Sequence, residues 1–436
     1  MADDELERET TEVLRRLVRF NTVNPPGNER SAIEYLDQYL AQAGFRTEIL
    51  AATPERPNLV ADLDGERDGP TLCLLGHVDT VLADAAEWSH DPWSGDLADG
   101  YLWGRGAIDM KSQVAAEAVA GASLAGQGWR PGRGKLKLVF TADEETGGVL
   151  GASWITANHP DKVGCDMLIN EGAGESFHYR GKRHYGVCCA EKGIFRFSIT
   201  AIGTAGHASM PKMGDNALLK LGPVLQKLAS QPVSFDLTEA PAALLAGLGE
   251  DPSDPGAAIE RIAADEPRLR ALIEPMFGVT LTPTMVSASG QMNVIPSRAR
   301  IMVDCRVPPG LGEEAARRRI SQVLGEETDE LQIEFTERTP GNASAVRGDL
   351  MSAIEAWVAA NDPGATAVPV ILTGFSDSRW WRHHFPDCVA YGFFPQRHQG
   401  LLEAAPLMHN ADERIDVRDL GFAARFYAEI ARELLA

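Results

Sequence analysis

The stretch TLCLLGHVDT, residues 71–80, decides the fold of this chain. It is a short run of apolar residues that ends in two polar side chains, His77 and Asp79. Three similar runs are NLVADL (58–63), KLKLVFT (135–141) and DMLIN (166–170). Runs that are apolar on both faces are typical of a sheet covered by helices on both sides. We therefore predict α/β architecture with a mostly parallel sheet.

Helices and a second domain follow from the spacing of apolar residues. Helical spacing predicts helices over 4–20, 29–43 and 111–125, with Gly44 placed to end the second. Near residue 190 the pattern changes to alternation with a period of two. The order β-α-β-β-α-β is predicted for 195–203, 215–229, 282–289, 299–307, 312–325 and 331–337. This predicts an inserted α+β domain at 193–338, between parts of a catalytic domain at 1–192 and 339–436. Residues 233–280 elaborate the insert, and we have no functional interpretation of them.

Composition narrows the classes of partner. The net charge of −21 repels phosphate backbones, which argues against nucleic acid. The segment MADDELERET lacks the features of a signal peptide, and no apolar run is long enough to cross a bilayer. The six cysteines form no C-x-x-C motif. We expect a reduced, cytoplasmic protein with no membrane partner.

Histidine and carboxylate side chains follow the predicted strands. Ligands of open α/β sheets bind beyond the carboxyl ends of the strands, so these residues are the candidates for a site. They are His77 and Asp79, Glu144 and Glu145, Glu171, and Asp109 just before the 111–125 helix. Imidazole and carboxylate groups are ligands of zinc, and two metals ~3.5–4 Å apart can share one carboxylate.

Each candidate also has a structural explanation when it is taken alone. A lone His after a strand is more often a polar cap than a ligand. Asp109 is most economically a helix N-cap, and Asp143-Glu144-Glu145 reads as a solvated acidic edge. Glu171 alone is a loop carboxylate. Their coincidence at strand ends and at a helix start favours a shared site.

Several ordered motifs together resemble the M20 metallopeptidase family. That family includes aminoacylases, acetylornithine deacetylases, succinyl-diaminopimelate desuccinylases and carboxypeptidases. The resemblance extends over nearly the whole chain. Its motifs are Asn24-Pro25-Pro26-Gly27, Gly76-His77-Val78-Asp79, Gly104-Arg105-Gly106-Ala107-Ile108-Asp109, Asp143-Glu144-Glu145, Asn170-Glu171-Gly172 and Met408-His409-Asn410-Ala411-Asp412-Glu413.

The resemblance implies two divalent metal ions, with zinc expected and cobalt or manganese as alternatives. One ion would be held by His77, Asp109 and Glu171, and the other by Asp109, Glu145 and His409. Glu144 would be the general base, and Asp79 would orient His77. The residues alone do not choose His409 over His383, His384 or His398, and Glu175 is a nearby rival to Glu171.

The resemblance also assigns residues of the insert, which it implies to be a lid. Gly206-His207-Ala208-Ser209 resembles a motif whose histidine stabilises the reaction intermediate, often across a dimer interface. Asn293 and Arg306 would bind the substrate carboxylate, and Ser376 and Arg379 would line the pocket. The alternative for Arg306 is a strand-edge salt bridge. Phe375-Ser376 replaces the Gly-Thr usual in the family. A homodimer through the lid domain is a further expectation.

The resemblance implies a small-molecule substrate and, as the reaction, hydrolysis of an amide next to a free carboxylate. We favour an N-acyl-amino-acid hydrolase or a dipeptide-type carboxypeptidase. A biosynthetic deacylase for acetylornithine or succinyl-diaminopimelate is the alternative, and a non-catalytic metal-binding family member is a third reading. A serine hydrolase is disfavoured because the chain has no G-x-S-x-G motif.

Overall fold

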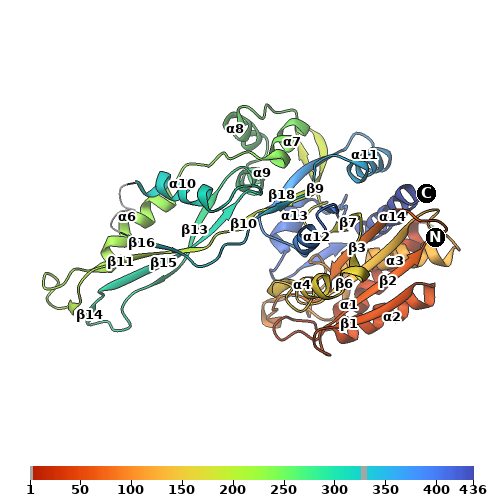
Figure 1. The fold of residues 1–436 in the computed structure, drawn as a ribbon, viewed down its shortest axis with the longest axis horizontal. Helices are drawn as coiled ribbons and strands as arrows, with labels where there is room; N and C mark the ends of the chain where they lie inside the picture. Colours follow the sequence, from red (N-terminus) through yellow and green to blue (C-terminus); the bar gives the residue numbers. More distant parts are fainter. Residues whose placement is uncertain (1–2, 326–330) are drawn as a thin grey trace. The chain divides into compact units, whose positions relative to one another are not determined.

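The computed structural model describes residues 3–325 and 331–436 (Figure 1). Contacts within the chain divide it into two compact units. The first unit comprises the chain up to Cys189 together with Ser344–Val370 and Ser376–Ala436. The second comprises the described residues of Ala190–Ala343, and Ile371–Phe375.

The first unit is built on one large sheet. Its strands lie in the order β1 (Arg46–Ala51), β2 (Pro57–Asp64), β6 (Lys135–Thr141), β3 (Thr71–His77), β7 (Met167–Asn170), β19 (Val389–Gly392) and β9 (Lys182–Glu191). The central strands β6, β3, β7 and β19 are parallel, and the outer pairings are antiparallel. The predicted α/β fold with a mostly parallel central sheet is confirmed. Further strands pair with β9, namely β8 (Ser176–Tyr179) and β18 (Thr366–Leu372).

Helices cover both faces of this sheet, which explains why its central strands are apolar on both sides. One layer contains α1 (Asp3–Arg19), α2 (Arg30–Ala43), α3 (Lys111–Gly126) and α14 (Val417–Leu434), with α11 (Asp349–Asn361) against α14. On the other face, Ile155 of α4 (Ala152–Asn158) and Trp381 of α12 (Ser378–His384) pack in one buried cluster with Leu75. Gly44 ends α2 with φ 101°, a conformation that favours glycine, and Asp416 caps α14.

Smaller elements complete the first unit. A separate sheet contains β4 (Asp96–Ala98), β5 (Tyr101–Trp103) and β20 (Arg414–Asp416). The short helices are α5 (Pro160–Val163) and α13 (Leu401–Ala404). None of the helices in the described part of the chain has the length and apolar character that a bilayer crossing requires.

The second unit is an antiparallel sheet with two helices against it. In chain order its main elements are β11 (Phe197–Ile202), α6 (Ala217–Ala229), β13 (Thr280–Ser287), β15 (Arg298–Val307), α10 (Glu313–Leu324) and β16 (Gln332–Phe335). The sheet order is β13-β15-β11-β16, and apolar residues of both helices share its core. The predicted β-α-β-β-α-β order is confirmed.

The elaboration at 233–280 is helical. It contains α7 (Glu239–Gly247), α8 (Pro255–Asp265) and α9 (Pro267–Ile273), which lie in the chain between α6 and β13. The remaining strands are short: β10 (Gly193–Ile194) pairs with β15, β12 (Gly206–His207) pairs with β14 (Val294–Ile295), and β17 (Asn342–Ala343) pairs with the end of β9.

A buried carboxyl group in α3 gives a first testable prediction. Glu117 is fully buried, one of its oxygens accepts a hydrogen bond from Gln113, and the other has no partner among the described residues. Burial raises the pKa of Glu117 well above its ordinary value. The folded chain therefore keeps a proton that the unfolded chain releases above about pH 4.5, so this contribution to stability is lost as the pH rises.

Glu117→Gln is expected to remove that pH dependence because the amide does not titrate. As the pH rises from 5 to 8, the free energy of unfolding of the variant should increase relative to that of the wild type. The gain is at most about 1.4 kcal/mol per pH unit, the limit for one proton. Urea denaturation of both proteins at several pH values measures it, and a constant difference would show that Glu117 is already ionised.

Candidate metal centre

The parallel strands bring polar residues to one edge of the large sheet. His77 is the last residue of β3, Glu171 follows β7, and Glu144 and Glu145 lie in the turn after β6. In the register of the sheet, His77 is opposite Thr141, the last residue of β6. Asp109 ends the loop before α3. The chain thus delivers a histidine and several carboxylates to one place.

Asp109 lies between two histidines. Its Oδ1 is 3.2 Å from His77 Nε2, and its Oδ2 is 3.1 Å from His409 Nε2. Glu171 Oε1 is 3.8 Å from His77 Nε2, and Glu145 Oε2 is 3.3 Å from His409 Nε2. The structure therefore brings together all five residues that the resemblance implied as metal ligands, with one carboxylate oxygen of Asp109 facing each histidine.

Ligand atoms group in more than one way around His77. Two sets have all their ligand atoms within 4.8 Å of one another: His77, Asp109 and Glu145, and His77, Glu144 and Glu171. Both of these sets contain His77, whereas the two ligand sets that the resemblance implies have Asp109 in common. We prefer the division at Asp109, because its two oxygens face different histidines and a carboxylate can bridge two cations.

Burial and neighbouring charges shift the pKa values of several side chains at this edge. Burial, and next the charge of Asp109, raise the pKa of Glu171 to about 7. Burial, and next the charge of Glu171, raise the pKa of Glu144 well above its ordinary value. Hydrogen bonds to Asp109 and Glu145 raise the pKa of His409 to about 10. The carboxylates thus repel one another, and those that contact His409 favour the charged form of its imidazole.

The donor set fits a pair of divalent cations. Imidazole nitrogens and carboxylate oxygens are ordinary ligands of such ions, and positive charge would relieve the repulsion among the carboxylates. Glu145 Oε1 is buried without a hydrogen-bond partner among the described residues, which leaves a further oxygen for coordination.

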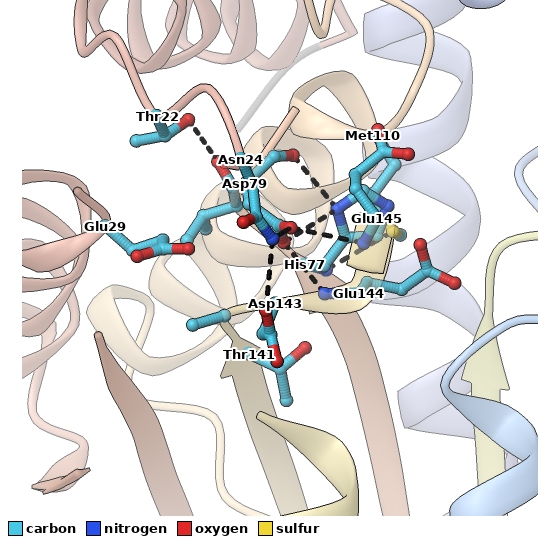
Figure 2. A network of polar contacts seen from close by, with 12 residues as sticks. Thr22, Asn24, Glu29, His77, Asp79, Met110, Thr141, Asp143, Glu144 and Glu145 are labelled. Atoms are coloured by element: carbon cyan, nitrogen blue, oxygen red, sulfur yellow. Dashed lines mark hydrogen bonds and ion pairs between the residues drawn. The ribbon is translucent and has the colours of Figure 1, made fainter. Parts of the chain in front are cut away.

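Asp79 fixes both His77 and the turn that carries Glu144 (Figure 2). It is fully buried, its Oδ1 accepts the backbone N–H of Glu144 at 3.1 Å, and its Oδ2 accepts that of Glu145 at 3.2 Å. His77 Nδ1 is 3.1 Å from the backbone oxygen of Asp79 and 3.5 Å from Oδ1. In Figure 2 the Glu144 carboxyl group points away from this network.

Sequence reasoning gave no role to several residues that hold this turn. Asn24 Nδ2 donates to Asp79 Oδ2 at 2.8 Å and to Asp143 Oδ1 at 3.1 Å. Asp143 has φ 72°, and its carboxylate also contacts Arg56 at 3.1 Å. Arg56 in turn forms a buried pair with Glu29. The motif containing Asn24 was visible, but its partner Asp79 lies 55 residues away, so no local pattern predicts the bond.

The competing candidates do not join the cluster. The helix-cap explanation for Asp109 is wrong, because Met110 is the N-cap of α3 and makes no side-chain cap hydrogen bond. His383 and His384 pack against each other, and His384 Nδ1 contacts the backbone oxygen of Trp380. Neither they nor His398 and Glu175 belong to either set of possible ligands in the described residues; His409 is also outside both sets, but it differs from them by its contacts with Asp109 and Glu145.

The predicted residues of the second unit lie near its short β12–β14 pair and on β15. His207 is exposed, and its Nδ1 is 2.7 Å from Ser209 Oγ. Asn293 is also exposed, and its backbone oxygen accepts the N–H of Ala208. Arg306 forms the salt bridge that sequence left open, with Nε 2.7 Å from Asp304 Oδ1, but β15 is paired on both sides and is not an edge strand. Its Nη1 has no hydrogen-bond partner among the described residues.

Two predicted pocket residues lie at α12 of the first unit. Ser376 is buried, and its Oγ accepts hydrogen bonds from Asn170 Nδ2 and from the Ser378 N–H. Since Asn170 directly precedes Glu171, Ser376 supports the end of β7. The Arg379 guanidinium lies over the Trp380 ring, 4.4 Å from its centroid.

Comparison with known proteins finds relatives that match nearly the whole chain. A succinyl-diaminopimelate desuccinylase of Rhodospirillum centenum is 29% identical over 416 residues, which cover 93% of this chain and 92% of that protein. An M20 family metallo-carboxypeptidase from Sulfolobus solfataricus has a similar fold, with a TM-score of 0.71 and 17% identity over 97% of this chain and 98% of its own. A dinuclear metal-binding M20 peptidase from Bacillus subtilis gives a TM-score of 0.63 and 13% identity over 100% and 99%.

The match to a family is extensive. Residues 73–433 match the description of peptidase family M20/M25/M40, and this span contains every residue of the candidate metal centre. The chain therefore belongs to peptidase family M20/M25/M40 and is a metallohydrolase, as its motifs predicted.

Proposed function

We propose that this hydrolase cleaves the amide bond of an N-acylated amino acid or a dipeptide, next to a free carboxylate. The observation that carries the proposal is the placement of Asp109 between His77 and His409, with Glu144 close by. Such an arrangement suits the activation of a water molecule. It also contains the carboxyl group of Glu144, which can accept a proton and donate it again.

We propose that His77, Asp109 and Glu171 hold one divalent cation, and that Asp109, Glu145 and His409 hold the other. Zinc is our preferred metal, with cobalt or manganese as alternatives, because the ligands are imidazole and carboxylate. When bound, the cations would polarise the scissile carbonyl and lower the pKa of the attacking water.

Glu144 acts in this proposal as the general base and then as the general acid. Its carboxylate accepts a proton from the water and later gives it to the leaving amine. Two features support this role: Asp79 fixes the backbone of Glu144, and the Glu144 side chain is not used in the network around Asp79. Asp79 also orients His77, the usual task of an outer carboxylate.

Residues of the second unit would bind the substrate. Arg306 Nη1 is a donor without a partner in the described residues, and a guanidinium suits the recognition of a carboxylate. We propose that Arg306 and Asn293 bind the carboxylate and that His207 donates a hydrogen bond to the developing oxyanion. Ser376 and Arg379 are proposed pocket residues, with Ser376 acting by supporting β7. The inserted unit is proposed to serve as a lid.

A biosynthetic deacylase is the second candidate. The observation in its favour is the full-length similarity to succinyl-diaminopimelate desuccinylases. Such a substrate is itself an N-acylated amino acid with a free carboxylate, so the same site chemistry would serve it.

A hydrolysis panel separates the two candidates and tests the proposal. The protein is loaded with zinc, cobalt or manganese and incubated with N-acyl amino acids, dipeptides, N-acetylornithine and N-succinyl-diaminopimelate. We expect chelator-sensitive turnover, fastest on the first two groups. Preference for N-succinyl-diaminopimelate would select the deacylase, and activity that survives removal of the metal would contradict both.

We also propose that the protein is a homodimer through its second unit. Four strongly exposed apolar side chains of this unit support this: Met213 (73% exposed) before α6, Leu219 (73%) on α6, and Met285 (69%) and Val286 (61%) on β13. Among the described strands, β13 pairs only with β15, so its other edge is open to a second copy.

The double variant Leu219→Lys with Met285→Lys is expected to convert a dimer into a monomer, because it places charge at two of these exposed apolar positions. Light scattering coupled to size-exclusion chromatography measures the mass. Leu97→Lys is the matched control, because Leu97 is an exposed leucine (47%) of the first unit. A wild-type protein that is monomeric at micromolar concentration would contradict the proposal.

A cytoplasmic location remains a proposal. All six cysteines are free, as suits a reducing compartment, and the net charge of −21 gives no support to binding of nucleic acid.

A further inference from the structure

Glu413 forms an unusually complete set of hydrogen bonds. It follows His409 by four residues, and its side chain is fully buried. Both carboxylate oxygens accept two donors each. The donors are Ile108 N (2.6 Å) and Asp109 N (3.0 Å) on Oε1, and Gly106 N (3.1 Å) and Arg105 Nη1 (2.6 Å) on Oε2.

The main chain of Glu413 binds the same loop. Its backbone oxygen accepts the N–H of Gly104 at 3.0 Å. Side chain and backbone together therefore fix residues 104–109, the loop that ends at Asp109. Through Glu413, the segment that carries His409 is fastened directly to the backbone of Asp109.

This connection matters because neither segment is held by regular secondary structure at this point. His409 and Asp412 have φ 59° and 61°, which is uncommon for residues other than glycine. Asp109 is a short side chain, so the position of its oxygens follows the position of its backbone. A displacement of about 1 Å is enough to spoil a site of this kind.

We propose that Glu413 is a positioning residue that sets the separation of Asp109 and His409, and with it the affinity for the cation that these two residues share. The inference rests on the proposed function only in that divalent cations bind at this edge of the sheet. Partners that orient a metal ligand from outside typically change metal affinity by about 10–100-fold when they are replaced.

Glu413→Gln is the test variant, because it keeps the size of the side chain but turns an NH₂ group toward N–H donors. Asp419→Asn is the matched control. Asp419 is also fully buried and accepts the backbone N–H groups of Arg397 (2.7 Å), His398 (2.9 Å) and Gln399 (2.8 Å). The loop that it holds contains none of the five proposed metal ligands, so the control isolates the general cost of losing a buried carboxylate.

Titration calorimetry of the metal-free full chain with Zn²⁺ or Co²⁺ gives the readout, below the melting temperature of each variant. We expect Glu413→Gln to weaken one of the two cations by about 10–100-fold. The other cation should change by less, and Asp419→Asn should lower the melting temperature while keeping both affinities. Wild-type affinities for both cations in Glu413→Gln would overturn the inference.

A second variant serves if Glu413→Gln does not fold. Arg105→Lys keeps the charge but loses the planar guanidinium that contacts Glu413, so a smaller loss for the same cation is expected, and unchanged affinity would overturn the inference. Failure of the proposed function looks different: the wild type would bind two cations and hydrolyse nothing in the panel. That result leaves the affinity comparison for Glu413 valid.

Discussion

Replacing Glu144 by glutamine is expected to lower kcat by about 10²–10⁴-fold, the range for loss of a general acid–base group. The amide cannot accept a proton from water or return one to the leaving amine. Metal content should stay at the wild-type level, because Glu144 is not among the proposed ligands. Steady-state kinetics beside metal analysis of the same sample measure both quantities.

Two neighbouring glutamates serve as controls for Glu144. Glu145→Gln removes a proposed ligand, so it should lose cation affinity as well as turnover. Glu175→Gln removes a carboxyl group that lies outside both sets of possible ligands. The turnover and the cation affinity of this variant should stay close to the wild-type values. Near-normal kcat in Glu144→Gln would show that another group moves the proton.

The largest effect on metal binding is expected from Asp109→Asn. Asp109 presents one oxygen to His77 and the other to His409, so its charge contributes to both proposed cation positions. We expect both affinities to fall by more than about 100-fold, since even the residues that orient ligands contribute about 10–100-fold. Calorimetric titration of the metal-free variant measures the loss.

His409→Ala is the matched comparison for Asp109→Asn. His409 contacts Asp109 and Glu145, the other two proposed ligands of its cation. Its loss should therefore weaken that cation and spare the one proposed beside His77 and Glu171. Equal and small effects of the two substitutions would mean that Asp109 does not bridge. The number of cations that each variant binds therefore distinguishes a carboxylate that bridges two cations from one that binds a single cation.

The fold was predictable where apolar patterning reflects burial. Strands β3, β6 and β7 are buried on both faces, so their apolar runs mark them directly. Strand β9 begins with Lys182 and Arg183 and was not recognised, although its later residues are buried. Strand β1 is half-exposed at the edge of the sheet and also carries no clear pattern.

The candidate site was only partly predictable from residue patterns. His77 ends β3 and Glu145 follows β6, and the geometry of parallel sheets brings such positions together. His409 lies in a loop after a short turn, and no pattern distinguishes it from the other histidines, so its role required the family motif. The supporting bonds of Asn24 and Glu413 join segments far apart in the chain, and burial of polar groups becomes visible only in three dimensions.

Crystals of the zinc-loaded protein, with X-ray data collected at the zinc edge, would test most directly whether five side chains bind two cations. We expect two anomalous peaks on opposite sides of the Asp109 carboxylate, one beside His77 and Glu171 and the other beside Glu145 and His409. A single peak, or peaks away from Asp109, would contradict the two-cation site.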